Sequence, residues 1–141
     1  MKANQRCSKW LALPIFLTAI VCSGHVHAVN VSSVQSGDWN NTATWDCGCV
    51  PGAGDNITIS TGTTVKVDTT RHTGNLTVNG TLDTNHQFFE FEGTTFTNNG
   101  SITSSTAVDG EIDFNGVGAV AGTSQTIAGT GTYAGWRILY H

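Results

Sequence analysis

Two short segments, Asn79-Gly-Thr-Leu82 and Asn99-Gly-Ser-Ile102, repeat the same pattern of residue types. In both, an Asn-Gly pair that favours a tight corner precedes a hydroxyl residue and an apolar residue. Their spacing sets a period of roughly 20 residues, and a short fixed period in a chain rich in Thr, Asn and Gly is typical of coiled rungs stacked on one another. The repeat predicts an all-β fold, a right-handed parallel β-helix, with a β-sandwich as the alternative.

A second pair of segments gives nearly the same period. In Gln87-Phe-Phe-Glu-Phe-Glu92 and in Glu111-Ile-Asp-Phe114, acidic and apolar residues alternate, as in strands with one buried face. The offset from Glu90 to Glu111 exceeds that from Asn79 to Asn99 by a single position. At this period, roughly four rungs fit between residues 57 and 133, and their stability depends on stacking against neighbours.

The segment 1–28 has the features of an export signal. Lys2, Arg6 and Lys9 form a basic start, an apolar run extends over residues 10–22, and Val26-His27-Ala28 resembles a peptidase recognition site. The apolar run is short for a membrane span, so we expect a cleaved signal and a secreted or cell-surface protein.

The expected mature chain, residues 29–141, is acidic and rich in residues that favour strands. It retains three of the six basic residues and all ten acidic ones, which gives a net charge of −7. Such a balance disfavours nucleic acid and anionic membranes as partners. The sequence divides into a strand and cap loop (29–55), the rungs (56–133) and an apolar tail (134–141).

Two tryptophans and two cysteines lie in the expected cap loop. Trp39 and Trp45 either cover the open end of the helix or stack on sugar rings, and the sequence favours the cap. Cys47 and Cys49 are the two cysteines that remain after signal removal, and in an oxidising compartment they form either a local disulfide or a bond to another chain.

Four acidic side chains form the candidate metal site. Glu90, Glu92, Glu111 and Asp113 are expected to point outward from neighbouring rungs, which lie about 4.8 Å apart. Such a patch either is a solvated face, binds calcium through oxygen ligands, or supplies the carboxylates of a glycan-cleaving enzyme. The solvated face is the favoured interpretation, with calcium as the one candidate cofactor. No serine-hydrolase or zinc-protease motif occurs in the sequence.

Several segments resemble bacterial secreted and cell-surface β-helix proteins with adhesin-like repeats. Ser36-Gly-Asp-Trp39, Ala43-Thr-Trp45 and the segment 50–59 are similar to the start of such proteins, including relatives of the eight-glycine domain. Three later segments look like their rungs: Gly74-Asn-Leu-Thr-Val-Asn-Gly-Thr-Leu82, Phe96-Thr-Asn-Asn-Gly-Ser-Ile102 and Ser124-Gln-Thr-Ile-Ala-Gly-Thr-Gly131. The resemblance implies an exported, non-enzymatic module that acts in adhesion or extracellular structure.

The expected partners are copies of the chain itself or a surface protein or glycan. The runner-up function is a carbohydrate-binding or carbohydrate-cleaving β-helix that uses the acidic face. In the resembling proteins another rung usually follows Gly-Thr-Gly, whereas here an apolar tail ends the sequence. The tail is therefore expected to fold back as a lid, to receive a partner's rung, or to mark a fragment of a longer adhesin.

Overall fold

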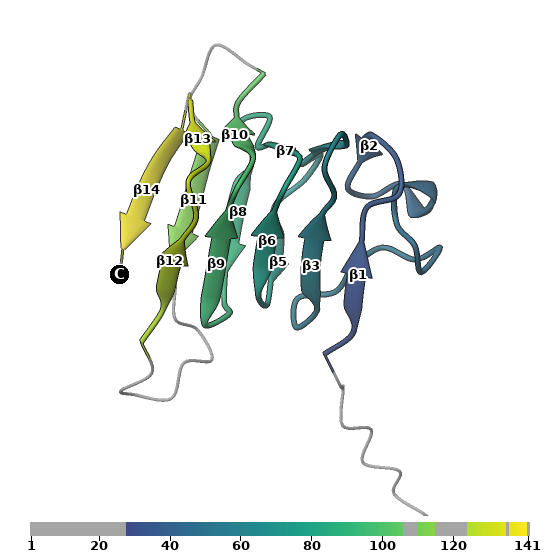
Figure 1. Cartoon of the computed structure of the whole chain (residues 1–141), viewed down its shortest axis with the longest axis horizontal. Helices are drawn as coiled ribbons and strands as arrows, with labels where there is room; N and C mark the ends of the chain where they lie inside the picture. Colours follow the sequence, from purple (N-terminus) through teal and green to yellow (C-terminus); the bar gives the residue numbers. More distant parts are fainter. Residues whose placement is uncertain (1–27, 106–109, 115–123, 135, 141) are drawn as a thin grey trace, which may run out of the picture.

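The computed structural model describes residues 28–105, 110–114, 124–134 and, as backbone, 136–140 (Figure 1). Apart from Ala28, the predicted export signal lies outside these residues. One 3-10 turn, η1 (Thr42–Thr44), interrupts this described chain of short strands.

The strands form three parallel sheets, and in each sheet the neighbouring strands are distant in sequence. The first sheet contains β1 (Asn30–Ser32), β3 (Asn56–Ile59), β6 (Leu76–Val78), β9 (Thr95–Asn98) and β12 (Thr126–Ala128). The second contains β2 (Gly37–Asp38), β4 (Thr64–Lys66), β7 (Thr81–Asp83), β10 (Ser101–Thr103) and β13 (Thr132–Tyr133). The third contains β5 (Arg71–Thr73), β8 (Phe88–Phe91), β11 (Gly110–Phe114) and β14 (Trp136–Tyr140).

This topology is that of a short parallel β-helix, as the repeat predicted. Successive strands occupy the three sheets in turn, so β3-β4-β5 is one rung and β12-β13-β14 is the fourth. The strands β1 and β2 form a partial layer before the first rung. A sandwich of antiparallel strands is excluded, because every pair of named strands in the described chain is parallel, and its one antiparallel contact is a single bridge between Ser33 and Trp45.

The core is built from columns of apolar side chains that follow the register between rungs. In the first sheet Val31, Ile57, Leu76 and Phe96 stack in register and are buried. Each such side chain contributes about 1.5–3 kcal/mol on burial. Because a single rung is too thin to enclose a core, these contacts between rungs hold the fold together.

The predicted register holds at the Asn-Gly corners and fails at the acidic strands. Leu82 pairs with Ile102, as the spacing of the two Asn-Gly segments predicted. Glu111, however, pairs with Phe88, so the residue in register with Glu90 is Asp113 instead of Glu111. Alternating side chains have a period of two, so a shift of two residues keeps the same faces in and out. The acid pattern therefore predicted the faces without fixing the register.

The Asn-Gly corners are held by backbone hydrogen bonds to the rung below. The N–H of Gly80 donates to the carbonyl oxygen of Ile59 at 3.1 Å, and that of Gly100 donates to the carbonyl oxygen of Val78 at 3.0 Å. The side chain of Asn99 also donates to the Oδ1 of Asn79 at 3.0 Å. The corners therefore stack as regularly as the strands that they connect.

The N-terminal end of the helix is closed by the loop that carries the two tryptophans. Trp39 and Trp45 are 0% and 2% exposed, and their ring centroids lie 4.9 Å apart. Trp39 also packs edge-on against Phe89 of the third sheet. The Trp45 Nε1 donates to the Trp39 carbonyl oxygen at 2.8 Å, whereas the buried Trp39 Nε1 has no partner within the described residues. Because both indoles are buried, neither can stack on a sugar.

At the opposite end, two core-facing side chains of the described residues are partly exposed. Ile127 is in register with the buried Phe96, and Tyr133 with the buried Ile102, yet their side chains are 41% and 42% exposed. Both occupy core-facing positions in the last rung. The segment 134–141, which the sequence assigned to an apolar tail after the rungs, contributes β14, which pairs with β11 and completes the fourth rung.

Candidate functional site

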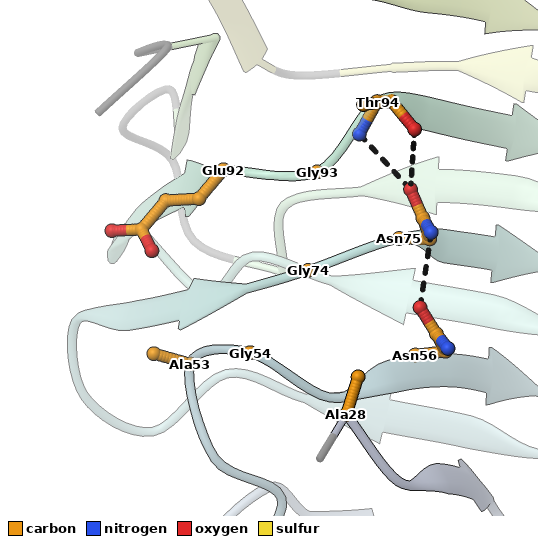
Figure 2. Close-up of a pocket in the computed structure, with 9 residues that line it drawn as sticks. All are labelled: Ala28, Ala53, Gly54, Asn56, Gly74, Asn75, Glu92, Gly93 and Thr94. Carbon is orange, nitrogen blue, oxygen red and sulfur yellow. Dashed lines mark hydrogen bonds between the residues drawn. The ribbon is translucent and has the colours of Figure 1, made fainter. Parts of the chain in front are cut away.

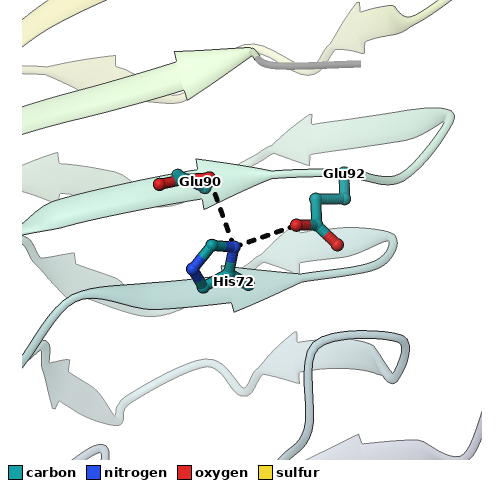
Figure 3. Close-up of side chains that lie close together, drawn as sticks. All are labelled: His72, Glu90 and Glu92. Carbon is teal, nitrogen blue, oxygen red and sulfur yellow. Dashed lines mark hydrogen bonds and ion pairs between the residues drawn. The ribbon is translucent and has the colours of Figure 1, made fainter. Parts of the chain in front are cut away.

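One cluster of titratable side chains lies on the outer face of the third sheet, and Figure 3 shows its geometry. His72 lies in β5 and pairs in register with Glu90 of β8, while Glu92 directly follows β8. The His72 Nδ1 lies 3.2 Å from the Glu90 Oε2 and 2.9 Å from the Glu92 Oε1. The parallel register therefore brings one imidazole against two carboxylates.

The cluster can act as an ion pair or as a set of ligands. A positively charged His72 would offset one of the two carboxylate charges, although charge pairs this accessible to water contribute little to stability. The three ligand atoms lie within 4.8 Å of one another. An imidazole with two carboxylates suits ions such as Zn²⁺, whereas Ca²⁺ prefers oxygen ligands alone. The donor set thus differs from the all-carboxylate patch that the sequence predicted.

The structure divides the four predicted metal ligands between different positions. Glu90 and Glu92 meet through His72, and Asp113 lies in register over Glu90 but is only 9% exposed. Glu111 lies over the exposed Phe88 instead. His72 is absent from the predicted ligands because no short spacing along the sequence connects it with Glu90 and Glu92. The signal that could have identified it is the register of the strand that lies one rung before Glu90.

A groove of about 320 Å³ runs across the rungs beside this cluster (Figure 2). Its floor contains Gly54, Gly74 and Gly93, which stack on successive layers. A Cβ on Gly74 would lie 2.8 Å from the carbonyl oxygen of Asp55, and one on Gly93 would lie 2.5 Å from the carbonyl carbon of Gly74. Such contacts leave no room for a side chain, so the floor of the groove is bare backbone.

One wall of the groove is a ladder of asparagine side chains. The Nδ2 of Asn56 donates to the Oδ1 of Asn30 at 2.9 Å, and the Nδ2 of Asn75 donates to the Oδ1 of Asn56 at 3.0 Å. The Oδ1 of Asn75 then accepts from the backbone N–H groups of Thr94 and Thr95 at 3.0 and 2.9 Å. The ladder links four layers of the first sheet, and Glu92 also lines the groove. The groove therefore offers amides, backbone groups and a carboxylate to a polar ligand.

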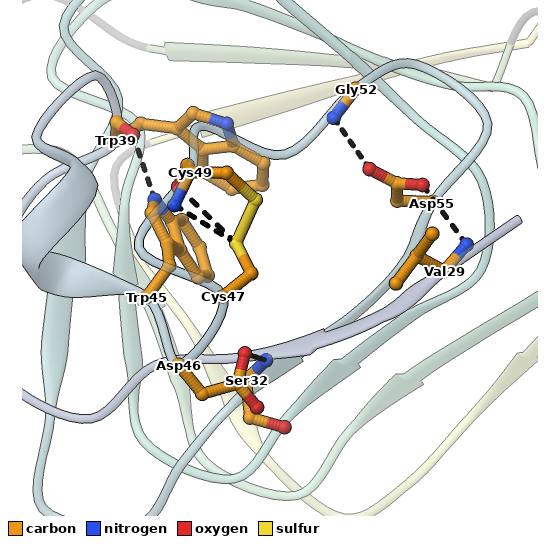
Figure 4. Close-up of a disulfide and its surroundings, with 9 residues drawn as sticks. All are labelled: Val29, Ser32, Trp39, Trp45, Asp46, Cys47, Cys49, Gly52 and Asp55. Carbon is orange, nitrogen blue, oxygen red and sulfur yellow. Dashed lines mark hydrogen bonds between the residues drawn. A yellow bond between two sulfur atoms is a disulfide. The ribbon is translucent and has the colours of Figure 1, made fainter.

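The two cysteines of the cap loop are joined to each other (Figure 4). Cys47 and Cys49 form a disulfide with a Cα–Cα distance of 5.1 Å. The neighbouring Asp46 accepts a hydrogen bond from the N–H of Ser32 in β1 at 3.0 Å. The disulfide is thus a local staple of the loop that covers the first layer, and it lies on the surface rather than among the core side chains.

Comparison of the chain with models of protein families, with curated proteins and with solved structures finds no match. Within the described residues, no helix has the length and apolar character that a membrane crossing needs. The functional interpretation therefore rests on the geometry of the groove, the His72 cluster and the two ends.

Proposed function

We propose that the chain is an exported, non-enzymatic β-helix module that acts in surface adhesion or extracellular structure. The observation that carries this proposal is the contrast between a covered N-terminal end and exposed core-facing side chains, Ile127 and Tyr133, in the last described rung. A rigid prism with one sealed end is suited to bind a partner through the other. The occupant that we propose is a second copy of the chain.

Because the N-terminal end is covered, it restricts how copies of the chain can assemble. Head-to-tail stacking would need both ends open, and it would produce filaments. With Trp39 and Trp45 buried under the cap loop, the exposed rung is the end left for contact between copies. Two copies that join by this end form a closed, two-fold symmetric pair. The local disulfide and the apolar run of residues 10–22 support export, since disulfides persist in oxidising compartments.

Two experiments test this proposal. Cell fractionation and surface labelling of the full chain in a bacterial host should place it outside the cytoplasm. Light scattering on the exported protein should give a dimer that the variant Ile127→Lys converts to a monomer. The matched control is Phe88→Lys, because Phe88 is 50% exposed on the side of the prism rather than at its end. A monomer at all concentrations, or equal effects of both variants, would contradict end-to-end assembly.

A second candidate function is binding of a carbohydrate, and the groove is the observation that favours it. A floor of bare backbone beside Asn56 and Asn75 offers donors and acceptors to hydroxyl groups, and Glu92 lies at one edge. Titration of soluble oligosaccharides, with heat as the readout, tests this candidate. Binding that Glu92→Gln weakens and Glu111→Gln leaves unchanged would support it, and absence of any binding would remove it.

We also propose that the outer face of the third sheet binds calcium. Glu90 and Glu92 supply carboxylate oxygens within reach of each other, and Asp113 stacks over Glu90 in register. Calorimetric titrations with Ca²⁺ and with Zn²⁺ separate the two kinds of site. Ca²⁺ binding that is lost in Glu90→Gln and kept in His72→Ala would support an oxygen-ligand site. The reverse preference, Zn²⁺ binding that depends on His72, would replace calcium by a transition metal.

A further inference from the structure

The backbone nitrogen of Val29 lies directly against a carboxylate. Its N–H donates to the Oδ1 of Asp55 at 3.0 Å, and the Oδ2 of Asp55 accepts from the N–H of Gly52 at 2.7 Å (Figure 4). The carbonyl oxygen of Val29 accepts from the N–H of Asn56 at 2.8 Å. Val29 is thus fixed on both sides of its Cα, at the point where the described chain joins the first sheet.

The same nitrogen belongs to the peptide bond at which the sequence predicts cleavage. Val26-His27-Ala28 places the cut between Ala28 and Val29. Hydrolysis breaks this C–N bond with one water molecule, leaves a carboxylate on Ala28 and leaves an amine on Val29. A free α-amino group has a pKa of about 7.7–8.0, so at neutral pH it is largely protonated.

We propose that removal of the signal creates an α-ammonium group on Val29 that Asp55 binds as an ion pair, which anchors the first strand of the exported protein. The proposal rests on the export that is part of the proposed function. It adds a positive charge to the donor of a hydrogen bond whose acceptor is already a carboxylate, without moving the chain, so that both partners are charged.

The distribution of charges favours this pairing. Of the basic side chains that the structure describes, Lys66 pairs with Asp38 and Arg71 with Asp68. Within the same residues, Asp55 has no basic side chain within ion-pair distance and accepts from two backbone N–H groups. A new positive charge at Val29 would therefore give Asp55 a counter-ion in a chain that is short of cations.

Two other carboxylates lie in this region and provide comparisons. Asp46 accepts from the N–H of Ser32 at 3.0 Å, on the same strand β1, and that nitrogen stays an amide after processing. Glu92 lines the groove with Ala28 but is paired with His72. Because Ala28 is a lining residue, its removal would also widen the groove beside Gly54.

The first measurement is the intact mass of the full chain after export from a bacterial host. A mature protein that begins at Val29 is expected. An exported protein with a different first residue would overturn this inference and leave the proposed function standing. A chain that stays unprocessed inside the cell would count against the export itself.

The second measurement is urea unfolding of the exported protein and its Asp55→Asn variant. At pH 6 the substitution should raise the unfolding equilibrium constant about tenfold, which corresponds to about 1.4 kcal/mol and is typical of a hydrogen bond to a charged group. An ion pair raises the pKa of the amine, so its stabilisation is complete below about pH 8 and is lost at higher pH. At pH 10 the effect of the substitution should shrink to less than about threefold.

Matched controls separate the ion pair from an ordinary hydrogen bond. Asp46→Asn should have the same effect at both values of pH, since Ser32 keeps its amide. Chemical acetylation of the Val29 amine, which keeps an N–H but removes the positive charge, should reduce the effect of Asp55→Asn at pH 6 to its size at pH 10. If Asp55→Asn fails to fold, the titration of the amine in the wild-type protein, followed by its rate of acylation, decides the question. An ordinary pKa for this amine, or an effect of Asp55→Asn that is equal at both values of pH, would overturn the proposal.

Discussion

Both ends of the helix carry large apolar side chains, which are buried at the N-terminal end and partly exposed at the other. At the N-terminal end, Trp39 lies under a loop, packs against Trp45 and Phe89 and is fully buried. At the other end, Ile127 and Tyr133 follow the register of the core and remain partly exposed in the described structure. The difference shows that register alone does not bury a side chain in a solenoid. A further layer has to cover it.

The largest expected effect comes from the sealed end. Trp39→Ala should lower the free energy of unfolding by about 3–5 kcal/mol, because a large buried side chain is lost and a cavity remains. Ile127→Ala should cost about 1 kcal/mol or less at a protein concentration low enough to keep the chain monomeric, since the side chain is then partly in water. Urea unfolding at neutral pH and at this concentration measures both variants. Equal losses for the two variants would break the comparison and would indicate that the last rung is covered even in the monomer.

A substitution of Asn75, in the middle of the helix, should lower the free energy of unfolding by an amount between these two values. Asn75→Ala removes the acceptor of two backbone N–H groups, those of Thr94 and Thr95, and should cost about 2 kcal/mol. The control Asn99→Ala removes one exposed bond to Asn79 and should cost about 0.5 kcal/mol. The same unfolding assay distinguishes them. A larger loss for Asn99 than for Asn75 would show that the groove ladder does not couple the rungs.

A smaller effect is expected from the staple of the cap. Replacing both Cys47 and Cys49 by Ser opens a ring of three residues, for which the loss of chain entropy predicts about 1.5 kcal/mol. The midpoint temperature of thermal unfolding of this double variant should therefore be much closer to that of the wild type than to that of Trp39→Ala. If the double variant is as unstable as Trp39→Ala, the sulfur bond rather than the indoles would close this end.

The smallest effect is expected at the exposed cluster on the side of the prism. His72→Ala should cost about 0.5 kcal/mol without added metal, because exposed charge pairs contribute little and salt screens them. The control Glu111→Gln changes a carboxylate on the same face that lies over Phe88. Denaturation in low and high salt measures the difference. A loss for His72→Ala as large as that for Asn75→Ala would mean that this cluster holds the third sheet together.

The fold was predictable because its signals are local and repeated. The spacing of Asn79 and Asn99 fixed the period, and alternating apolar residues fixed the inner face. The register of the third sheet was not predictable from the acid pattern. A shift of two residues leaves alternation unchanged, so Glu111 and Asp113 fit either alignment.

The candidate site was less accessible to sequence reasoning than the fold. His72 reaches Glu90 and Glu92 from a different strand, and its ligand partners are set by register rather than by spacing along the chain. The groove depends on three stacked glycines, 54, 74 and 93, whose alignment appears once the rungs are in place. Sequence patterns therefore predicted the faces of the helix and left the contacts between rungs to be found in the structure.

The stacked Asn-Gly corners have a consequence for chemical ageing. In a flexible chain, Asn-Gly is prone to deamidation because the backbone nitrogen of the glycine attacks the asparagine side chain. Here the N–H groups of Gly80 and Gly100 are hydrogen-bonded to the rung below, which restrains both nitrogens from that attack. The corners that set the period of the helix are thereby protected from spontaneous conversion to aspartate for as long as the rungs stay stacked.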